Sequence, residues 1–133
     1  VVREVIGCVQ AARGQAVFER SAARDEVWRE RAFEAVVGGA WVSGVFDRVV
    51  LRRAADGAAL GAEIYDFKTD RGATDDLLRE RHTEQLGLYR DVAALLTGLP
   101  VEQIRCFVVA TEGGRLVEIA AGASQFLASS EAT

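Results

Sequence analysis

Three side chains near the middle of this sequence, Asp47, Asp66 and Lys68, are of the types that bind divalent cations and act on phosphate esters. Asp66 and Lys68 stand two residues apart in the stretch GAEIYDFKTD, which reads as a strand rich in Ile, Tyr and Phe. Because alternate side chains of a strand point to the same face, this spacing directs an acid and an amine to one place.

Asp47 lies in a preceding apolar stretch, AWVSGVFDRVVLRR, with Val45 and Val49 expected on its own face of the strand. A carboxylate in such surroundings is unfavourable unless it is paired or bound to a metal. A turn joins this stretch to the strand that carries Asp66, so we expect the two strands to pair as neighbours. Asp47 and Asp66 would then converge, with Lys68 beside them.

Two converging carboxylates are the usual protein ligands of a hard cation such as Mg²⁺ or Mn²⁺, which also takes water and substrate phosphate oxygens. Such an ion polarises a phosphoryl group and lowers the pKa of a bound water, and a nearby lysine orients that water or stabilises the developing charge. The spacing leaves a second interpretation open. In it, Asp66 and Lys68 form an ordinary ion pair and Asp47 pairs with an arginine.

The periodicity of apolar residues predicts the elements that must position these groups. The expected strands cover residues 27–37, 40–53, 62–69, 103–111 and 115–120, and the expected helices cover residues 1–12, 75–97 and 123–130. Strict alternation places Trp28 and Glu30 on one side of the first strand and Phe33 on the other. Gly44 is a candidate for a β-bulge in the second strand. Thr74 is the expected N-cap of the long helix.

This order of elements predicts an α/β fold with a mixed five-stranded sheet flanked by helices. A chain of 133 residues fits a single domain, residues 1–133. The chain begins with Val and contains no Met, which favours a piece of a larger polypeptide or a processed chain.

The composition excludes several classes of protein. The net charge of −4 argues against a strong non-specific nucleic-acid binder, although not against an enzyme that meets nucleic acid through bound cations. No apolar run reaches the roughly 18 residues that a membrane span needs. Cys8 and Cys106 are too far apart for a zinc knuckle and are most simply reduced core residues of a cytoplasmic protein.

Three motifs together resemble a known family. Gly44 and Asp47 match its first motif, the run Asp66, Phe67, Lys68 and Thr69 its second, and Gln85 and Tyr89 its third. Over about residues 27–117 the chain is similar to the nuclease domain at the C-terminus of RecB- and AddA-type helicase–nucleases. This family is a branch of the PD-(D/E)xK superfamily, and the resemblance implies a restriction-endonuclease-like core.

The resemblance also implies a role for each matched residue. Asp47 and Asp66, with the main-chain carbonyl of Phe67, would ligate Mg²⁺ or Mn²⁺, and Lys68 would be the catalytic lysine. Gln85 and Tyr89 would face the active site from the long helix, toward DNA or the catalytic groups. The implied activity is a metal-dependent DNA exonuclease in double-strand-break repair and recombination. Its implied partner is a helicase motor domain in the same chain or in another subunit.

One departure from the family pattern leaves alternatives open. Relatives often carry a metal-ligating His on an early helix, whereas the single His of this chain, His82, follows Lys68 and is not assigned that role. A second hypothesis is therefore a non-catalytic DNA-binding or scaffolding module of the same fold in a helicase complex. A third is an unrelated α/β domain in which the three charged groups form a surface ion-pair network.

Overall fold

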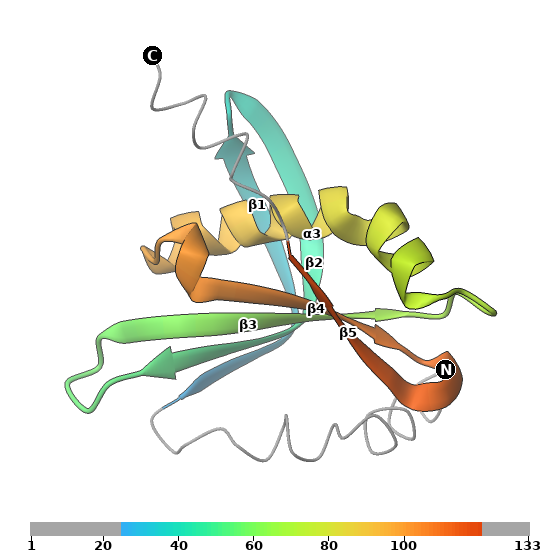
Figure 1. Cartoon of the computed structure of the whole chain (residues 1–133). Helices are drawn as coiled ribbons and strands as arrows, with labels where there is room; N and C mark the ends of the chain where they lie inside the picture. The colour runs from blue at the N-terminus through green and yellow to red at the C-terminus, as the bar shows by residue number, and fades with distance from the viewer. Residues whose placement is uncertain (1–24, 121–133) are drawn as a thin grey trace.

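The computed structural model describes residues 25–120, which form five strands, one α-helix and two short 3₁₀ turns (Figure 1). The elements are β1 (Glu26–Val37), β2 (Ala40–Arg53), β3 (Ala59–Lys68), α3 (Asp75–Thr97), η1 (Val101–Gln103), β4 (Ile104–Ala110), η2 (Glu112–Gly114) and β5 (Arg115–Ile119). The helices expected over residues 1–12 and 123–130 lie outside the described residues.

The five strands form one sheet in the order β1-β2-β3-β4-β5. Strands β1, β2 and β3 pair antiparallel as a meander, β3 pairs parallel with β4, and β4 pairs antiparallel with β5. A parallel pair requires a crossover connection, and α3 supplies it by lying across one face of the sheet (Figure 1). The expected mixed five-stranded sheet is confirmed.

Helix α3 begins and ends where the local sequence predicts. The hydroxyl of Thr74 accepts a hydrogen bond from the Leu77 amide at 3.2 Å, and Asp75 and Asp76 lie in the first turn, where the helix dipole favours acids. Gly98 ends the helix with a φ of 76°, a left-handed conformation that glycine adopts without strain. Within residues 25–120, no helix is both long and apolar enough to cross a membrane.

The sheet has a buried cluster on each face. The larger one fills the space between the sheet and α3 and includes Val49, Ile64, Leu86 and Val108, each with no exposed surface. The smaller one lies on the opposite face and contains Val50, Tyr65, Phe107 and Val109. The alternation of neighbouring residues between the two clusters, as in Val49 and Val50, places Asp66 on the face that α3 covers.

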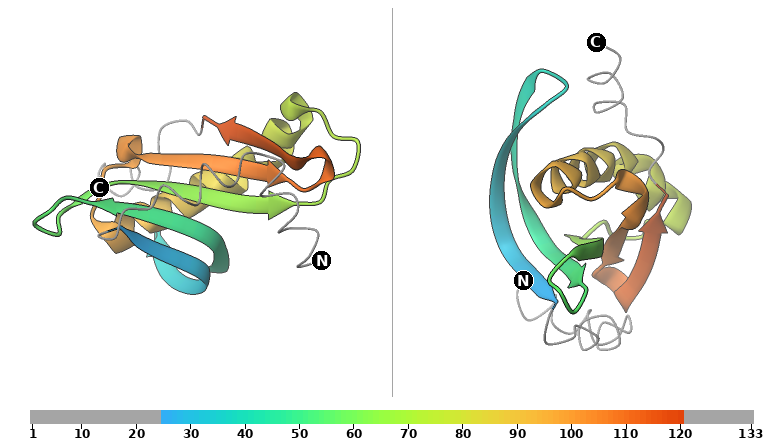
Figure 2. Two further views of the ribbon diagram at one scale, coloured as in Figure 1. Left: turned by 90° about the horizontal axis from the view of Figure 1, so that it is seen from below. Right: turned by 90° about the vertical axis from the view of Figure 1, so that its left-hand side faces the viewer.

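Strict alternation along β1 is wrong beyond Glu30. Trp28 and Phe33, which alternation puts on opposite faces, belong to the same buried core. Glu30 has a φ of 46°, and the otherwise continuous β1–β2 register has one gap, where Glu30 would face Asp47. A left-handed backbone is unfavourable for a residue with a Cβ, and here it turns the strand over so that Phe33 faces the helix. In Figure 2, β1 and β2 accordingly curve around α3.

The same break changes the surroundings of Asp47. Val45 and Val49, both expected on its face, have unlike environments, since Val49 is fully buried and Val45 is 45% exposed. The β-bulge considered at Gly44 is absent, because Gly44 pairs in register with Phe33. Its role is steric. A Cβ on Gly44 would lie 2.7 Å from Cζ of Phe33 and 3.3 Å from the hydroxyl oxygen of Tyr89.

Gly44→Ala should therefore lower the free energy of unfolding by about 1–3 kcal/mol, since the Phe33 ring must move to admit the methyl group. Gly87→Ala is the matched control, because no atom lies within 4 Å of its added Cβ and alanine is the better helix former. Urea unfolding monitored by circular dichroism measures both changes. Equal stability of the two variants would show that the close approach at Gly44 has no energetic weight.

Candidate active site

The carboxylates of Asp47 and Asp66 come together where β2 and β3 separate. The β2–β3 ladder runs as far as the pair Arg48 and Tyr65, and the next pair in that register would be Asp47 and Asp66. At this point the Phe67 amide of β3 donates its hydrogen bond to a side chain of β2 instead of to a main-chain carbonyl. The acceptor is Oδ2 of Asp47, at 2.8 Å. This contact holds the Asp47 carboxylate against β3, beside the carboxyl group of Asp66.

Lys68 lies beside the pair and bonds to one member of it. Its Nζ is 3.1 Å from Oδ2 of Asp66, a buried oxygen that the ammonium group approaches as an ion pair rather than as a well-aligned hydrogen bond. The Asp66 side chain is 7% exposed and the Lys68 side chain 22%. The structure thus brings Asp47, Asp66 and Lys68 together. The ion pair of the second interpretation is present, whereas within residues 25–120 the partner of Asp47 is a main-chain amide and not an arginine.

The main chain of Lys68 is held from the neighbouring parallel strand. Its carbonyl oxygen accepts two hydrogen bonds from Thr111, one from the amide at 2.9 Å and one from the hydroxyl at 3.1 Å. Thr111 is buried and stands directly after β4. The sequence analysis did not identify Thr111 as a site residue. Its position could have indicated this role, because Thr111 is a polar residue at the end of an apolar strand.

Burial and the neighbouring acid destabilise the charged form of Asp66. Burial, and next the nearby Asp47 carboxyl group, raise the pKa of Asp66 to about 6 against the opposing effect of the Lys68 ammonium group. Without a metal ion, two carboxylates and one ammonium group therefore share the site with an excess of negative charge. Such a surplus is what a divalent cation relieves.

Helix α3 adds Tyr89 and Gln85 to the same place. The Tyr89 ring meets Phe33 and Phe46 edge-on, with centroid distances of 5.3 and 5.6 Å. Its hydroxyl oxygen accepts a hydrogen bond from Nε2 of Gln85 at 3.4 Å. Burial raises the pKa of Tyr89, and the charge of Asp66 raises it further. Tyr89 thus packs in the core through its ring and presents its hydroxyl to the carboxylate pair.

His82, which the sequence did not assign as a metal ligand, has another partner. Its Nε2 lies 2.9 Å from Oδ2 of Asp70, and Arg81 pairs with the same oxygen at 3.2 Å. The hydrogen bond with His82 lowers the pKa of Asp70. These contacts hold the loop before α3 to the helix.

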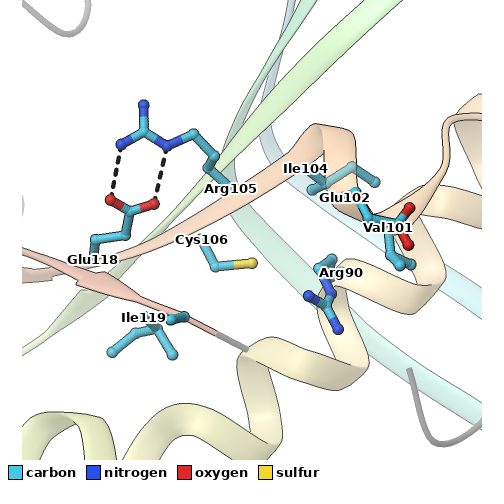
Figure 3. A pocket seen from close by; sticks show the side chains of 9 residues that line it. Arg90, Val101, Glu102, Ile104, Arg105, Cys106, Glu118 and Ile119 are labelled. Atoms are coloured by element: carbon cyan, nitrogen blue, oxygen red, sulfur yellow. Dashed lines mark hydrogen bonds and ion pairs between the residues drawn. The ribbon is translucent and has the colours of Figure 1, made fainter. Parts of the chain in front are cut away.

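A pocket of about 190 Å³ lies apart from the carboxylate pair, where α3 meets one end of β4 and β5 (Figure 3). Arg105 and Glu118 form an ion pair at its margin. Cys106 also lines it, but its thiol bonds to the Leu86 carbonyl, and burial raises its pKa to about 12. Cys106 is thus a free, buried core residue, as the sequence predicts, while Cys8 lies outside the described residues.

The oxygen atoms at the carboxylate pair fit a hard divalent cation. The Phe67 amide points toward β2, and in an extended strand the carbonyl of the same residue points to the same edge. Two carboxylates and this carbonyl are ligands of the kind that Mg²⁺ and Mn²⁺ take, with water in the remaining positions. Among residues 25–120, no three His, Cys, Asp or Glu side chains gather closely enough to hold a metal by themselves.

Comparison with known proteins identifies the family. A search of curated proteins found no match. A family model described as the PD-(D/E)XK nuclease superfamily matches residues 7–132, nearly the whole chain, including the strands of Asp47, Asp66 and Lys68 and the helix of Tyr89. The mixed sheet with its crossover helix agrees with that family's fold. On the strength of this match, the chain belongs to the PD-(D/E)XK nuclease superfamily.

Proposed function

We propose that this chain is a metal-dependent deoxyribonuclease domain of the RecB and AddA type, which hydrolyses phosphodiester bonds in DNA as an exonuclease. Membership of the superfamily indicates nuclease chemistry. The observation that carries the proposal is the meeting of Asp47, Asp66 and Lys68 at the point where β2 and β3 separate. Three charged groups from two strands, one of them the buried Asp66, are a costly arrangement for stability alone.

Each residue has a role that follows from its position. The carboxylates of Asp47 and Asp66 and the Phe67 carbonyl would hold Mg²⁺ or Mn²⁺, which supplies a Lewis acid and a bound water of lowered pKa. The main chain of Lys68 is held in place by Thr111, and its ammonium group lies beside Asp66 on a side chain that is partly exposed. There it would orient the attacking water or stabilise the charge that develops on the phosphate.

Tyr89 and Gln85 would bind the DNA beside the scissile phosphate. Both carry hydrogen-bond donors, and the Tyr89 hydroxyl lies near enough to Asp66 for that charge to raise its pKa. Phosphate oxygens accept hydrogen bonds from such tyrosine and glutamine side chains.

A helicase motor, in the same polypeptide or in a partner subunit, would deliver the DNA to this domain during double-strand-break repair. The resemblance of the three motifs to helicase–nucleases supports this assignment. The charge supports it too, because a net charge of −4 provides little electrostatic attraction for DNA, so another component must hold the strand.

The test is cleavage of fluorescently labelled single- and double-stranded DNA with Mn²⁺, with Mg²⁺ and with excess EDTA. We expect shortening of the DNA with either metal ion, none with EDTA, and none in the Asp66→Asn variant. Cleavage that persists in EDTA or in Asp66→Asn would contradict the proposal.

The alternative is a non-catalytic DNA-binding or scaffolding module of the same fold in a helicase complex. It is favoured by the small number of candidate ligands, because among residues 25–120 no third His, Cys, Asp or Glu side chain joins Asp47 and Asp66 in a metal-binding group. Retention of DNA by the protein in a gel-shift assay with Mn²⁺, without any cleavage, would support this alternative.

A further inference from the structure

We propose that Lys68 serves as a stand-in cation, which neutralises Asp66 while no metal is bound and is displaced when a divalent ion enters. This inference rests on the proposed metal-dependent function and concerns how the same site is loaded. It assigns Lys68 a task before catalysis, in addition to any role toward the phosphate.

The contacts of the two carboxylates differ in a way that points to this exchange. Asp47 accepts a hydrogen bond from a neutral donor, the Phe67 amide, at its Oδ2. Asp66 is stabilised by a charged group, the Lys68 ammonium, 3.1 Å from its buried Oδ2. A divalent ion held by both carboxylates needs an oxygen of Asp66, and it repels an ammonium group at that distance. Metal ion and Lys68 therefore compete for Asp66.

The ammonium group of Lys68 can move away from Asp66 without any change in the sheet. Its main chain is fixed by the two hydrogen bonds from Thr111 and by the parallel pairing of β3 with β4, where it stands opposite Ala110. Its side chain has a flexible four-carbon stem and is 22% exposed, so the ammonium group can rotate toward solvent. The displaced group moves to the open side of the site, where a DNA phosphate would lie.

Binding of Mn²⁺ alone, followed by the electron paramagnetic resonance signal of the free ion, tests the exchange. Lys68→Met should bind Mn²⁺ roughly threefold to tenfold more tightly than the natural protein, because no ion pair must be broken. Lys68→Arg should bind it no more tightly than the natural protein, and more weakly if its planar guanidinium group pairs with both Asp66 oxygens.

Arg81→Met is the matched control, since it removes the same charge from a residue that pairs with Asp70 instead of Asp66. We expect its Mn²⁺ affinity to stay within twofold of the natural value, as surface charges are largely screened at physiological salt. Circular dichroism confirms folding of each variant, and Lys68→Gln provides a second neutral replacement.

The outcomes separate this inference from the proposed function. Equal Mn²⁺ affinity of the natural protein, Lys68→Met and Lys68→Arg would overturn the displacement while leaving metal binding in place. If Lys68→Met and Arg81→Met raised the Mn²⁺ affinity equally, the increase would be an effect of overall charge. That result would also overturn the displacement. Absence of saturable Mn²⁺ binding by the natural protein would overturn both the inference and the metal-dependent function.

Discussion

Lys68→Met should lower the rate of DNA cleavage by at least about 10³-fold while the protein still binds Mn²⁺. The natural ammonium group is the one cation that the described structure places in contact with the carboxylate pair. Its loss removes the group that would orient the water or stabilise charge in the transition state. Single-turnover cleavage of labelled DNA at saturating Mn²⁺ measures the chemical step apart from binding and product release.

Two comparisons show whether the loss of cleavage in Lys68→Met reflects a catalytic role of Lys68. Arg81→Met removes an equal charge that pairs with Asp70, and we expect it to cleave DNA within about threefold of the natural rate. A catalytic role also predicts that Lys68→Met separates metal binding from cleavage. If Lys68→Met cleaved DNA within tenfold of the natural rate, Lys68 would be an ion-pair residue and the catalytic assignment would be wrong.

Asp66→Asn should abolish Mn²⁺ binding and, in the absence of metal, stabilise the fold at neutral pH. Burial and Asp47 raise the pKa of Asp66 to about 6 in the folded protein, against 3.8 for an ordinary Asp. Between pH 4 and 6 the folded state therefore holds a proton that the unfolded state has lost. Stability falls as the pH rises through this window and stays lower above it. Asparagine removes this penalty, which is roughly 3 kcal/mol for a pKa difference of this size.

Urea unfolding in EDTA at several values between pH 4 and pH 8 measures this effect. The natural protein should lose stability as the pH rises from 4 to 6, and Asp66→Asn should show a flatter profile and a higher free energy of unfolding at pH 7. Lys68 is partly exposed, so loss of its partner leaves no fully buried charge. A strong destabilisation by Asp66→Asn at pH 7 would instead support a structural ion pair.

Asp70→Asn is the control with the opposite sign. The hydrogen bond from His82 lowers the pKa of Asp70, so its stabilising contribution is present above the pKa of an ordinary Asp and is lost as the pH falls through the lower folded value. Asp70→Asn should therefore destabilise the protein at neutral pH without affecting Mn²⁺ binding. If Asp66→Asn stabilised the protein and Asp70→Asn destabilised it, the difference would come from the local surroundings of the two carboxyl groups, since only four residues separate them.

The elements of this fold could be predicted from local sequence because local chemistry determines them. The alternation of apolar residues marks the strands, and turn residues such as Gly38 and Gly39 mark the end of β1, where both adopt positive φ angles. The cap at Thr74 and the left-handed Gly98 bound α3. The antiparallel pairing of β2 with β3 also follows from their short connection, and with it the approach of Asp47 to Asp66.

Local alternation could not predict the reversal of β1. The assumption that successive side chains alternate between the two faces holds only for a regular extended strand. A glutamate gives no indication from its residue type that its φ is 46°. That conformation persists because Phe33 and Phe46 gain burial against Tyr89, a residue far along the chain. The steric need for Gly44 likewise depends on a ring from the neighbouring strand.

The sequence by itself determined which residue types stand at the site, their order along the chain and the strands that carry them. The tertiary structure decided how each group is held. Asp47 bonds to the Phe67 amide, Asp66 is buried deeply enough to change its pKa, and Thr111 anchors Lys68 across 43 residues of chain. The physical reason is that propensities and turns act between near neighbours, whereas burial, charge pairing and strain depend on contacts made only once the sheet and α3 have packed together.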